Sequence, residues 1–174
     1  MATIGLGANL PSPAGAPEAT IMAAIEDLRA AGRVRARSSF YQTEPLQYEQ
    51  QPPFVNAVLQ LETEMEPEPL LDSLLAIERR YGRERTENLH KGPRTLDLDL
   101  LLVDDLLMRS PRLTLPHPEL AQRRFVLAPL AEIAPDLQHP MLGATMLELL
   151  ARIPDKGANR KNAVRKLSGQ EKLP

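Results

Sequence analysis

The chain has 174 residues, of which 43% are hydrophobic and 25% charged, and its formal net charge is -2 at pH 7. These values are typical of one globular domain with a sizeable core, and they give no general attraction to nucleic acid or to an anionic membrane. The lack of cysteine excludes disulfides and thiolate metal sites, and no apolar run reaches the ~20 residues of a membrane span. We therefore expect a cytoplasmic monomer without nucleic-acid or membrane partners.

The first part of the chain predicts strands and a helix. A short apolar segment predicts a strand at residues 2–6. Apolar residues on one face predict a helix at residues 17–31, with a proline at its first position and a glycine after its end. Alternation of apolar and polar residues predicts strands at residues 33–42 and 54–63. Residues 43–53 contain three prolines and predict a long loop of the kind that often carries function.

The middle of the chain predicts a helix, a polar loop and a strand. Apolar residues spaced by four, three and four predict a helix from Leu70 to Tyr81. Residues 83–91 have no apolar period and predict a polar, mobile loop, and residues 95–103 predict a strand. Two further short helices are predicted, at residues 119–132 and 145–152.

The last twenty residues differ in composition from the rest. Residues 155–174 carry six Lys or Arg against two acids, which predicts a solvated, flexible basic tail after a single domain at residues 1–154. A weak contact of this tail with a polyanion or another partner is the alternative. Only residues 98–103 approach a continuous apolar run, so we expect an α+β fold with helices packed on a mostly antiparallel sheet.

Two aspartates in the strand at residues 95–103 are the main candidates for chemistry. Side chains alternate along a strand, which places Asp97 and Asp99 on one face, roughly 7 Å apart. The leucines of the segment are predicted on the other face: Leu96, Leu98, Leu100 and Leu102. Adjacent carboxylates repel, and Mg²⁺ prefers one or two carboxylates plus phosphates and water. The pair could hold one or two Mg²⁺ ions against a polyphosphate, or it could be a solvent-facing pair neutralised by basic residues.

Basic residues around the aspartates favour the polyphosphate. The nearby cations are Arg83, Arg85, Lys91 and Arg94, and Arg forks bind phosphate oxygens bidentately. No phosphate-binding loop of the Gly-x-x-x-x-Gly-Lys-Ser/Thr type is present, and the pair Gly5-x-Gly7 is a very weak nucleotide motif. Metal and arginines would therefore have to hold the phosphates.

The segment Gly92-Pro-Arg-Thr-Leu-Asp-Leu-Asp-Leu-Leu101 resembles the signature of the 6-hydroxymethyl-7,8-dihydropterin pyrophosphokinase family. The resemblance covers about residues 1–152, and its further motifs are at residues 7–9, 38–43, 51–56, 77–78, 82–85, 113–117, 123–125 and 129–135. It implies a ferredoxin-like α+β fold. It also implies transfer of pyrophosphate from ATP to the hydroxymethyl group of the dihydropterin, with release of AMP, in folate biosynthesis.

The same resemblance implies roles for individual residues. Asp97 and Asp99 would hold two Mg²⁺ ions, and Arg83 and Arg85 would be catalytic residues that close over the phosphates. The implied ATP contacts are Glu78, Arg83, Arg85, Arg94, Leu100, Arg112, Leu113, Thr114, His117 and Arg123. The implied pterin contacts are Asn9, Thr43, Glu44, Pro45, Leu46, Phe54, Asn56 and Phe125. The two phenylalanines could sandwich the ring and the Asn56 amide could bind its polar edge.

Individual positions allow other interpretations. His117 could be structural, and Phe54 and Phe125 could be ordinary core residues. The chain departs from the family pattern at three positions: Ala8, where the family usually has Ser; Phe54, where it often has Tyr; and Lys91, where it commonly has Trp. These departures concern the pterin side of the site and the closure of the loop.

Two other functions remain as alternatives at this stage. A different Mg²⁺-dependent phosphotransferase or nucleotidyltransferase could use the same acid pair, and a nucleotidyltransferase would release pyrophosphate in place of AMP. A ferredoxin-like RNA-binding module would read bases with aromatic residues exposed on its sheet. The chain has only six aromatic residues, and acids occupy the expected exposed face, which argues against this module.

Overall fold

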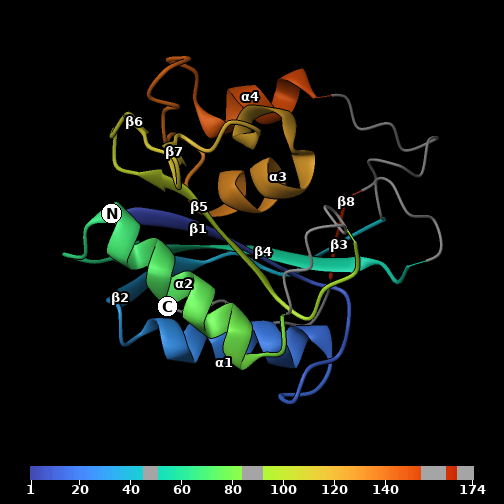
Figure 1. The fold of residues 1–174 in the computed structure, drawn as a ribbon. Coiled ribbons are helices and arrows are strands. Elements are labelled where there is room, and N and C mark those ends of the chain that lie inside the picture. Colours follow the sequence, from blue (N-terminus) through green and yellow to red (C-terminus); the bar gives the residue numbers. More distant parts are fainter. Residues whose placement is uncertain (45–50, 84–91, 154–163, 168–174) are drawn as a thin grey trace.

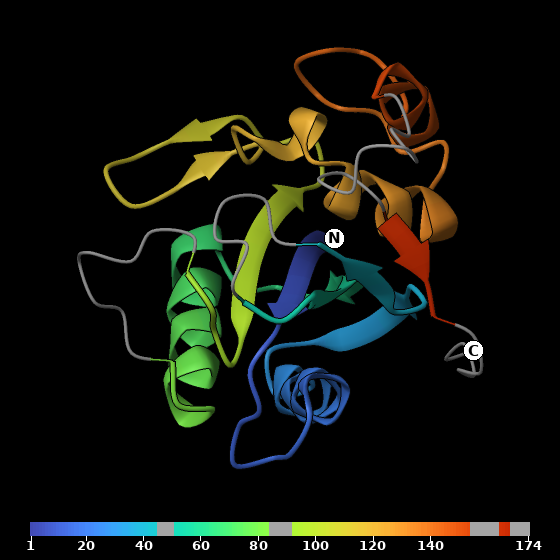
Figure 2. The same cartoon turned by 90° about the vertical axis from the view of Figure 1, so that its right-hand side faces the viewer.

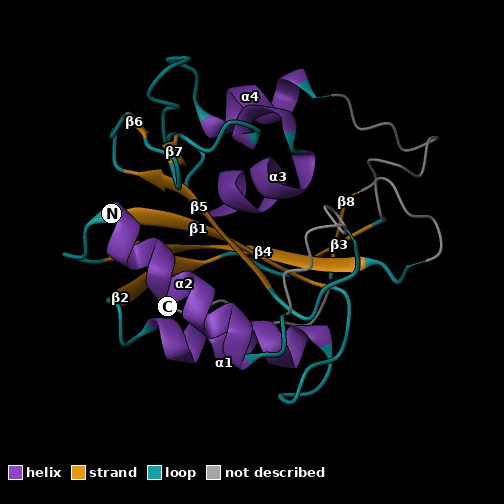
Figure 3. Cartoon of the chain, viewed as in Figure 1, coloured by secondary structure: helices purple, strands orange, loops and turns teal. Residues whose placement is uncertain are grey.

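A computed structural model describes residues 1–44, 51–83, 92–153 and 164–167. In these residues a six-stranded antiparallel sheet has the order β5-β1-β4-β3-β8, with β2 also pairing to β4 (Figures 1 and 3). The strands are β1 (Ala2–Ala8), β2 (Arg33–Arg37), β3 (Tyr41–Thr43), β4 (Phe54–Glu62), β5 (Asp97–Val103) and β8 (Val164–Lys166). A separate hairpin is formed by β6 (Met108–Arg109) and β7 (Thr114–Leu115). The helices are α1 (Pro17–Leu28), α2 (Pro67–Arg80), the 3-10 turn η1 (Leu120–Gln122), α3 (Arg124–Ile133) and α4 (Met146–Arg152).

Helices cover both faces of the sheet, as Figure 1 shows, and each face has its own core. Helices α1 and α2 pack on one face, where Ile21, Ile25, Leu70 and Leu74 are fully buried. On the other face α3 and α4 pack over Val58. Both α1 and α2 begin with a proline, at a position whose backbone N–H would have no helical partner. The sequence predicts this start for α1, whereas α2 begins at Pro67, three residues before the predicted start at Leu70. None of the helices in the described part of the chain has the length and apolar character needed to cross a bilayer.

Strand β5 contains a bulge that changes the predicted alternation. Leu100 pairs with Ile4 and Leu102 pairs with Thr3, so Leu101 is an extra residue between two consecutive pairs. Leu98 and Leu100 face α1 and α2, whereas Leu101 and Leu102 both belong to the core under α3 and α4. The prediction that Leu102 shares a face with Leu98 and Leu100 is therefore wrong, because simple alternation cannot anticipate an extra residue.

Three other predicted elements differ from the structure. The predicted strand at residues 33–42 divides into β2 and β3, because Ser38 bonds to Val58 through both its backbone and its hydroxyl and interrupts the regular ladder. The predicted helix at residues 119–132 divides into η1 and α3 at Arg123, which has an extended backbone. The predicted flexible tail contains the short strand β8, which pairs with the edge of the sheet.

Candidate active site

The two aspartates of β5 lie beside two glycines of β1. Asp97 pairs with Gly7, and Asp99 pairs with Gly5. Gly7 also pairs with Asn56 of β4 on its other side, and a Cβ atom on Gly7 would lie 3.1 Å from the Asn56 Oδ1 and 3.9 Å from the Asp97 Cβ. Asn56, Gly7 and Asp97 therefore form one row across three strands on the same face. Because Gly7 has no side chain, only backbone lies between the Asn56 amide and the Asp97 carboxylate, and we call this row of three residues the floor of the site.

Substitution Gly7→Ala tests this floor. The new methyl group would press on the Asn56 amide. With the two substrates that the family resemblance implies, we therefore expect a roughly fivefold rise in the KM for the pterin and little change in the KM for ATP. Gly5→Ala is the matched comparison, because its Cβ would meet the buried, apolar Leu101 side chain at 3.3 Å and not a polar group. Steady-state kinetics with each substrate varied in turn measures both constants. Equal effects of the two substitutions on the pterin KM would contradict a special role for Gly7.

Asp97 is held by two arginines. Arg83 bonds to Asp97 Oδ1 and also to Glu78, and the Arg94 Nη1 lies 2.5 Å from Asp97 Oδ2. Glu78 is buried at the end of α2, and its Oε1 accepts a hydrogen bond of 2.8 Å from the Leu98 backbone N–H. Although burial alone would lower it, the neighbouring Asp97 and Glu78 carboxylates raise the pKa of Arg83. Glu78 thus positions both Arg83 and the strand that carries the aspartates.

Asp99 lies in a second charged group. Its Oδ2 is 3.2 Å from the Arg123 Nη1, and Arg123 also pairs with Glu119. Burial and the charge of Asp97 raise the pKa of Asp99, although His117 and Arg123 act in the opposite direction. A partly buried carboxylate with a raised pKa is one that an added cation would stabilise.

His117 faces this second group as a neutral side chain. The Glu119 backbone N–H donates to His117 Nδ1 at 3.2 Å, so the neutral imidazole carries its proton on Nε2. Burial lowers the pKa of His117, against the attraction of Asp99. The backbone N–H of His117 donates to the Leu101 carbonyl at 2.8 Å and fixes the residue beside β5.

Each aspartate–arginine pair is next to a phenylalanine. The Arg94 guanidinium carbon lies 5.7 Å from the centre of the Phe54 ring, and the Arg123 carbon lies 5.7 Å from the centre of the Phe125 ring. Both rings are only partly buried, and Phe125 also packs against the core under α3 and α4. The arrangement places aromatic faces beside the charged groups from two different elements, β4 and the first turn of α3.

Two asparagines support the site in different ways. The Asn56 Nδ2 donates to Thr43 Oγ1 at 2.8 Å, which orients the amide on the floor. The Asn9 amide instead joins two protein segments: it donates to Gln51 and to the Pro52 carbonyl, and its Oδ1 accepts from the Arg94 backbone N–H at 2.7 Å. Asn9 is therefore a positioning residue for the segment that carries Arg94.

The aspartate pair fits a metal that takes part of its coordination from a ligand. Within the described residues there is no group of three or more His, Cys, Asp or Glu side chains that could hold an ion. Asp97 and Asp99 supply two carboxylates, which suits Mg²⁺ because this ion keeps several waters and binds phosphate oxygens. The raised pKa of Asp99 supports the same fit, since a cation would offset the repulsion by Asp97.

Five other predicted residues lie in the described part of the chain, and none of them forms an ion pair with Asp97 or Asp99 there. Leu100 is buried in the core on the α1–α2 side, so only its backbone could contact a nucleotide. The predicted residues Arg112, Leu113 and Thr114 lie on or next to the β6–β7 hairpin, where Arg112 pairs with Asp72 of α2. Glu44 is exposed at the end of β3. Arg85, Pro45 and Leu46 lie outside the described residues.

Sequence reasoning missed the two glycines and Glu119. Strand alternation contained a signal for the glycines, because Gly5 and Gly7 are two residues apart, as are Asp97 and Asp99 on the strand beside them. Glu119 had no signal, since its pairing with Arg123 depends on the turn η1.

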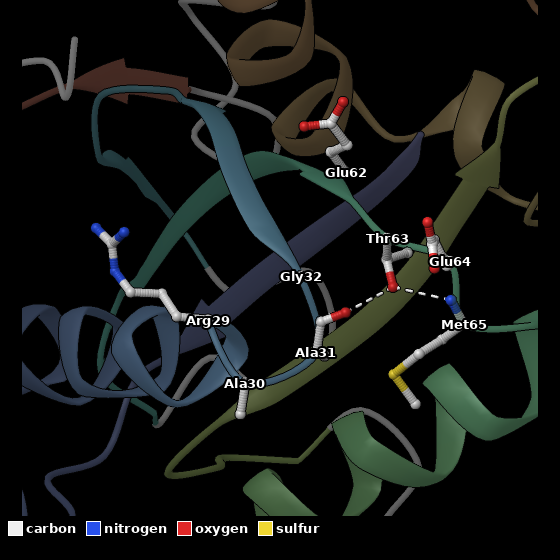
Figure 4. A pocket seen from close by; sticks show the side chains of 8 residues that line it. All are labelled: Arg29, Ala30, Ala31, Gly32, Glu62, Thr63, Glu64 and Met65. Atoms are coloured by element: carbon white, nitrogen blue, oxygen red, sulfur yellow. Dashed lines mark hydrogen bonds between the residues drawn. The ribbon is translucent and has the colours of Figure 1, made fainter.

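A depression at the other end of the sheet offers no comparable chemistry. It has a volume of about 590 Å³ and is lined by residues 29–32 and 62–65 (Figure 4). Its central hydroxyl, on Thr63, donates to the Ala31 carbonyl at 2.6 Å and accepts from the Met65 N–H at 3.1 Å. Arg29 and Glu62, which flank it, pair with Glu26 and Arg35. The aspartate site remains the better candidate.

Comparisons with known proteins identify the family of the chain. Residues 3–135 match the family described as 7,8-dihydro-6-hydroxymethylpterin-pyrophosphokinase. The 2-amino-4-hydroxy-6-hydroxymethyldihydropteridine pyrophosphokinase of Pseudomonas aeruginosa is 45% identical over 159 residues, which cover 90% of this chain and 94% of the relative. The Folic acid synthesis protein fol1 of Schizosaccharomyces pombe is 43% identical over 125 residues, which cover 72% of this chain but only 17% of that protein.

A solved structure supports the fold independently. The wild-type HPPK-DHPS of Plasmodium falciparum superimposes with a TM-score of 0.65 at 15% identity, over 87% of this chain and 44% of that chain. At this identity the likeness concerns the fold alone. The mixed fold with an antiparallel sheet, the match to residues 3–135 and the relative matched over nearly its whole length agree, and the chain belongs to the 7,8-dihydro-6-hydroxymethylpterin-pyrophosphokinase family.

Proposed function

We propose that the chain transfers pyrophosphate from ATP to the hydroxymethyl group of 6-hydroxymethyl-7,8-dihydropterin and releases AMP. The observation that carries this proposal is the shared floor of Asn56, Gly7 and Asp97. A neutral amide that can bind a heterocycle edge and a carboxylate among arginines lie on one face with no side chain between them. Such a floor suits a flat polar ring at one end and a polyphosphate at the other.

The phosphate end would be formed by cations that the protein already orients. Arg83, Arg94 and Arg123 are each fixed by a carboxylate, so little conformational entropy is lost when phosphate oxygens arrive. The His117 Nε2–H is a neutral donor beside them. Asp97 and Asp99 would hold Mg²⁺, which when bound neutralises phosphate charge and lowers the pKa of the attacking hydroxyl. Catalysis by the protein itself is then mainly positioning and charge stabilisation.

The pterin end would be formed by Asn56, Phe54 and Phe125. The Asn56 amide is oriented by Thr43, so it presents a fixed hydrogen-bonding edge to the ring. The two phenylalanines supply aromatic faces, and each contacts an arginine of the phosphate end. This continuity would place the hydroxymethyl group of the pterin next to the phosphates. The monomeric state and the cytoplasmic location expected from the sequence stay predictions.

Product analysis tests the proposal. With ATP, Mg²⁺ and the reduced hydroxymethylpterin, we expect AMP and a pyrophosphorylated pterin in equal amounts, measured by anion-exchange chromatography. A dihydropterin with a methyl group in place of the hydroxymethyl group is the control, because it lacks the attacking oxygen and should give no AMP. Release of inorganic pyrophosphate in place of AMP would show nucleotidyl transfer and refute the proposal.

A further inference from the structure

Strand β8 pairs with β3 at the edge of the sheet, and it lies beyond residues 3–135, which carry the family match. Tyr41 pairs with Lys166, and Thr43 pairs with Val164. Figure 2 shows β8, in red, at the edge of the sheet. The Leu167 backbone N–H donates to the Phe40 carbonyl at 2.9 Å, and the Leu167 side chain packs against the core on the α1–α2 side. The C-terminal strand is thus attached to β3 along the whole length of that strand.

A carboxylate at the end of α3 joins β3 and β8. The Glu132 side chain is only 9% exposed, and it accepts hydrogen bonds from the Ser39 N–H and hydroxyl at 3.0 and 2.9 Å. It also accepts from the Tyr41 hydroxyl at 3.1 Å and pairs with the Lys166 Nζ at 2.8 Å. Burial and the neighbouring Glu132 raise the pKa of Tyr41 to about 12, so its hydroxyl stays a donor. Lys166 is the one contact in this set that β8 supplies.

Strand β3 is also the support of the Asn56 amide. Thr43, at the end of β3, accepts the hydrogen bond from Asn56, and Tyr41 pairs with Asn56 across the ladder. A three-residue strand at a sheet edge has few ladder bonds and is marginally stable without a neighbour. Removing β8 would leave β3 as such an edge. The orientation of Asn56 then depends on how firmly β8 holds β3.

We propose that β8 is a positioning element for the pterin end of the site, acting through β3, Thr43 and Asn56. This inference rests on the proposed function, because it takes Asn56 to be a pterin contact. It predicts that loosening β8 weakens pterin binding selectively, since the arginines and aspartates of the phosphate end lie on other elements. A strand with a merely stabilising role would affect both substrates alike or neither.

Substitution Lys166→Glu in the full chain is the first test. A glutamate here would face the buried Glu132, and like charges would displace β8. We expect the pterin KM to rise about fivefold, with kcat and the ATP KM within about twofold of the unsubstituted chain. Lys166→Arg keeps the positive charge, so its pterin KM should equal that of the unsubstituted chain. Arg165→Pro, which disrupts β8 without touching Glu132, should reproduce the Lys166→Glu effect.

Asn56→Ala in the same assay distinguishes the role of β8 from the pterin site itself. A raised pterin KM in Asn56→Ala with normal constants in Lys166→Glu and Arg165→Pro would overturn the role of β8 and leave the pterin site standing. An unchanged pterin KM in Asn56→Ala would refute both the role of β8 and the assignment of Asn56 as a pterin contact. Equal rises in the two KM values, or a loss of kcat alone, would also overturn the inference. Thermal unfolding of each variant shows whether it is folded at the assay temperature.

Discussion

Asp97→Asn and Asp99→Asn are each expected to abolish AMP release, by about 10³-fold or more, while the protein stays folded. Asparagine matches aspartate in size but lacks the negative charge that a divalent cation needs. Asp97→Asn also removes the ion pairs that Arg83 and Arg94 form with Asp97. Both side chains are only partly buried and lie outside the two apolar cores, so the effect on stability should be much smaller than the effect on rate. AMP release at saturating substrates and the thermal unfolding midpoint measure the two effects separately.

Asp104→Asn is the matched control for this pair. Asp104 directly follows β5, and its exposed carboxylate pairs only with the chain N-terminus at 2.7 Å among the contacts of the described residues. This substitution removes the same charge from the same segment but should leave activity unchanged. Full activity in either Asp97→Asn or Asp99→Asn would refute the assignment of these residues as metal ligands.

Replacing Arg83 and Arg85 together by methionine should lower kcat by about 10²-fold and raise the dissociation constant for ATP much less. Arg83 is fixed between Glu78 and Asp97, so its charge is oriented towards the aspartates. Preoriented donors stabilise the charge that develops during transfer more than they stabilise bound ATP. Single-turnover rates and equilibrium titration with ATP distinguish the two quantities.

Arg80→Met is the control for the arginine substitutions. Arg80 lies three residues earlier, is 68% exposed and pairs with Asp27 of α1, away from the aspartates. Its loss should change neither quantity. If the double variant lost ATP affinity but kept its turnover rate, the two arginines would be binding residues and not catalytic ones.

The sequence was sufficient for the parts of the fold that depend on local pattern. Proline at the start of α1, the buried face of α2 and the alternation in β4 all follow from spacing along the chain, and the structure confirms them. The antiparallel α+β architecture is confirmed for the same reason. The break between β2 and β3 was not predictable, because the Ser38 hydroxyl that causes it needs Val58 from a distant strand as its partner.

The candidate site was predictable to the extent that its residues share a motif. Asp97, Asp99 and Arg94 are close in sequence and lie together in the structure. The contact of Arg83 with Asp97 follows from the packing of α2 beside β5, which the sequence shows only through the family resemblance. The support of Asn56 by β3 and β8 is a tertiary property, since the basic composition of residues 155–174 contains no strand pattern.

The bulge at Leu101 determines where β5 can tolerate a change in length. Deleting this one residue would leave Leu100 opposite Ile4 and Leu102 opposite Thr3, so Asp97 and Asp99 would keep their places beside Gly7 and Gly5. The cost would be the loss of a buried leucine, about 2–5 kcal/mol. A deletion between Asp97 and Leu100 would instead turn an aspartate towards the apolar core on the α1–α2 side. Insertions and deletions among family members should therefore be tolerated at this bulge and excluded from the four residues before it.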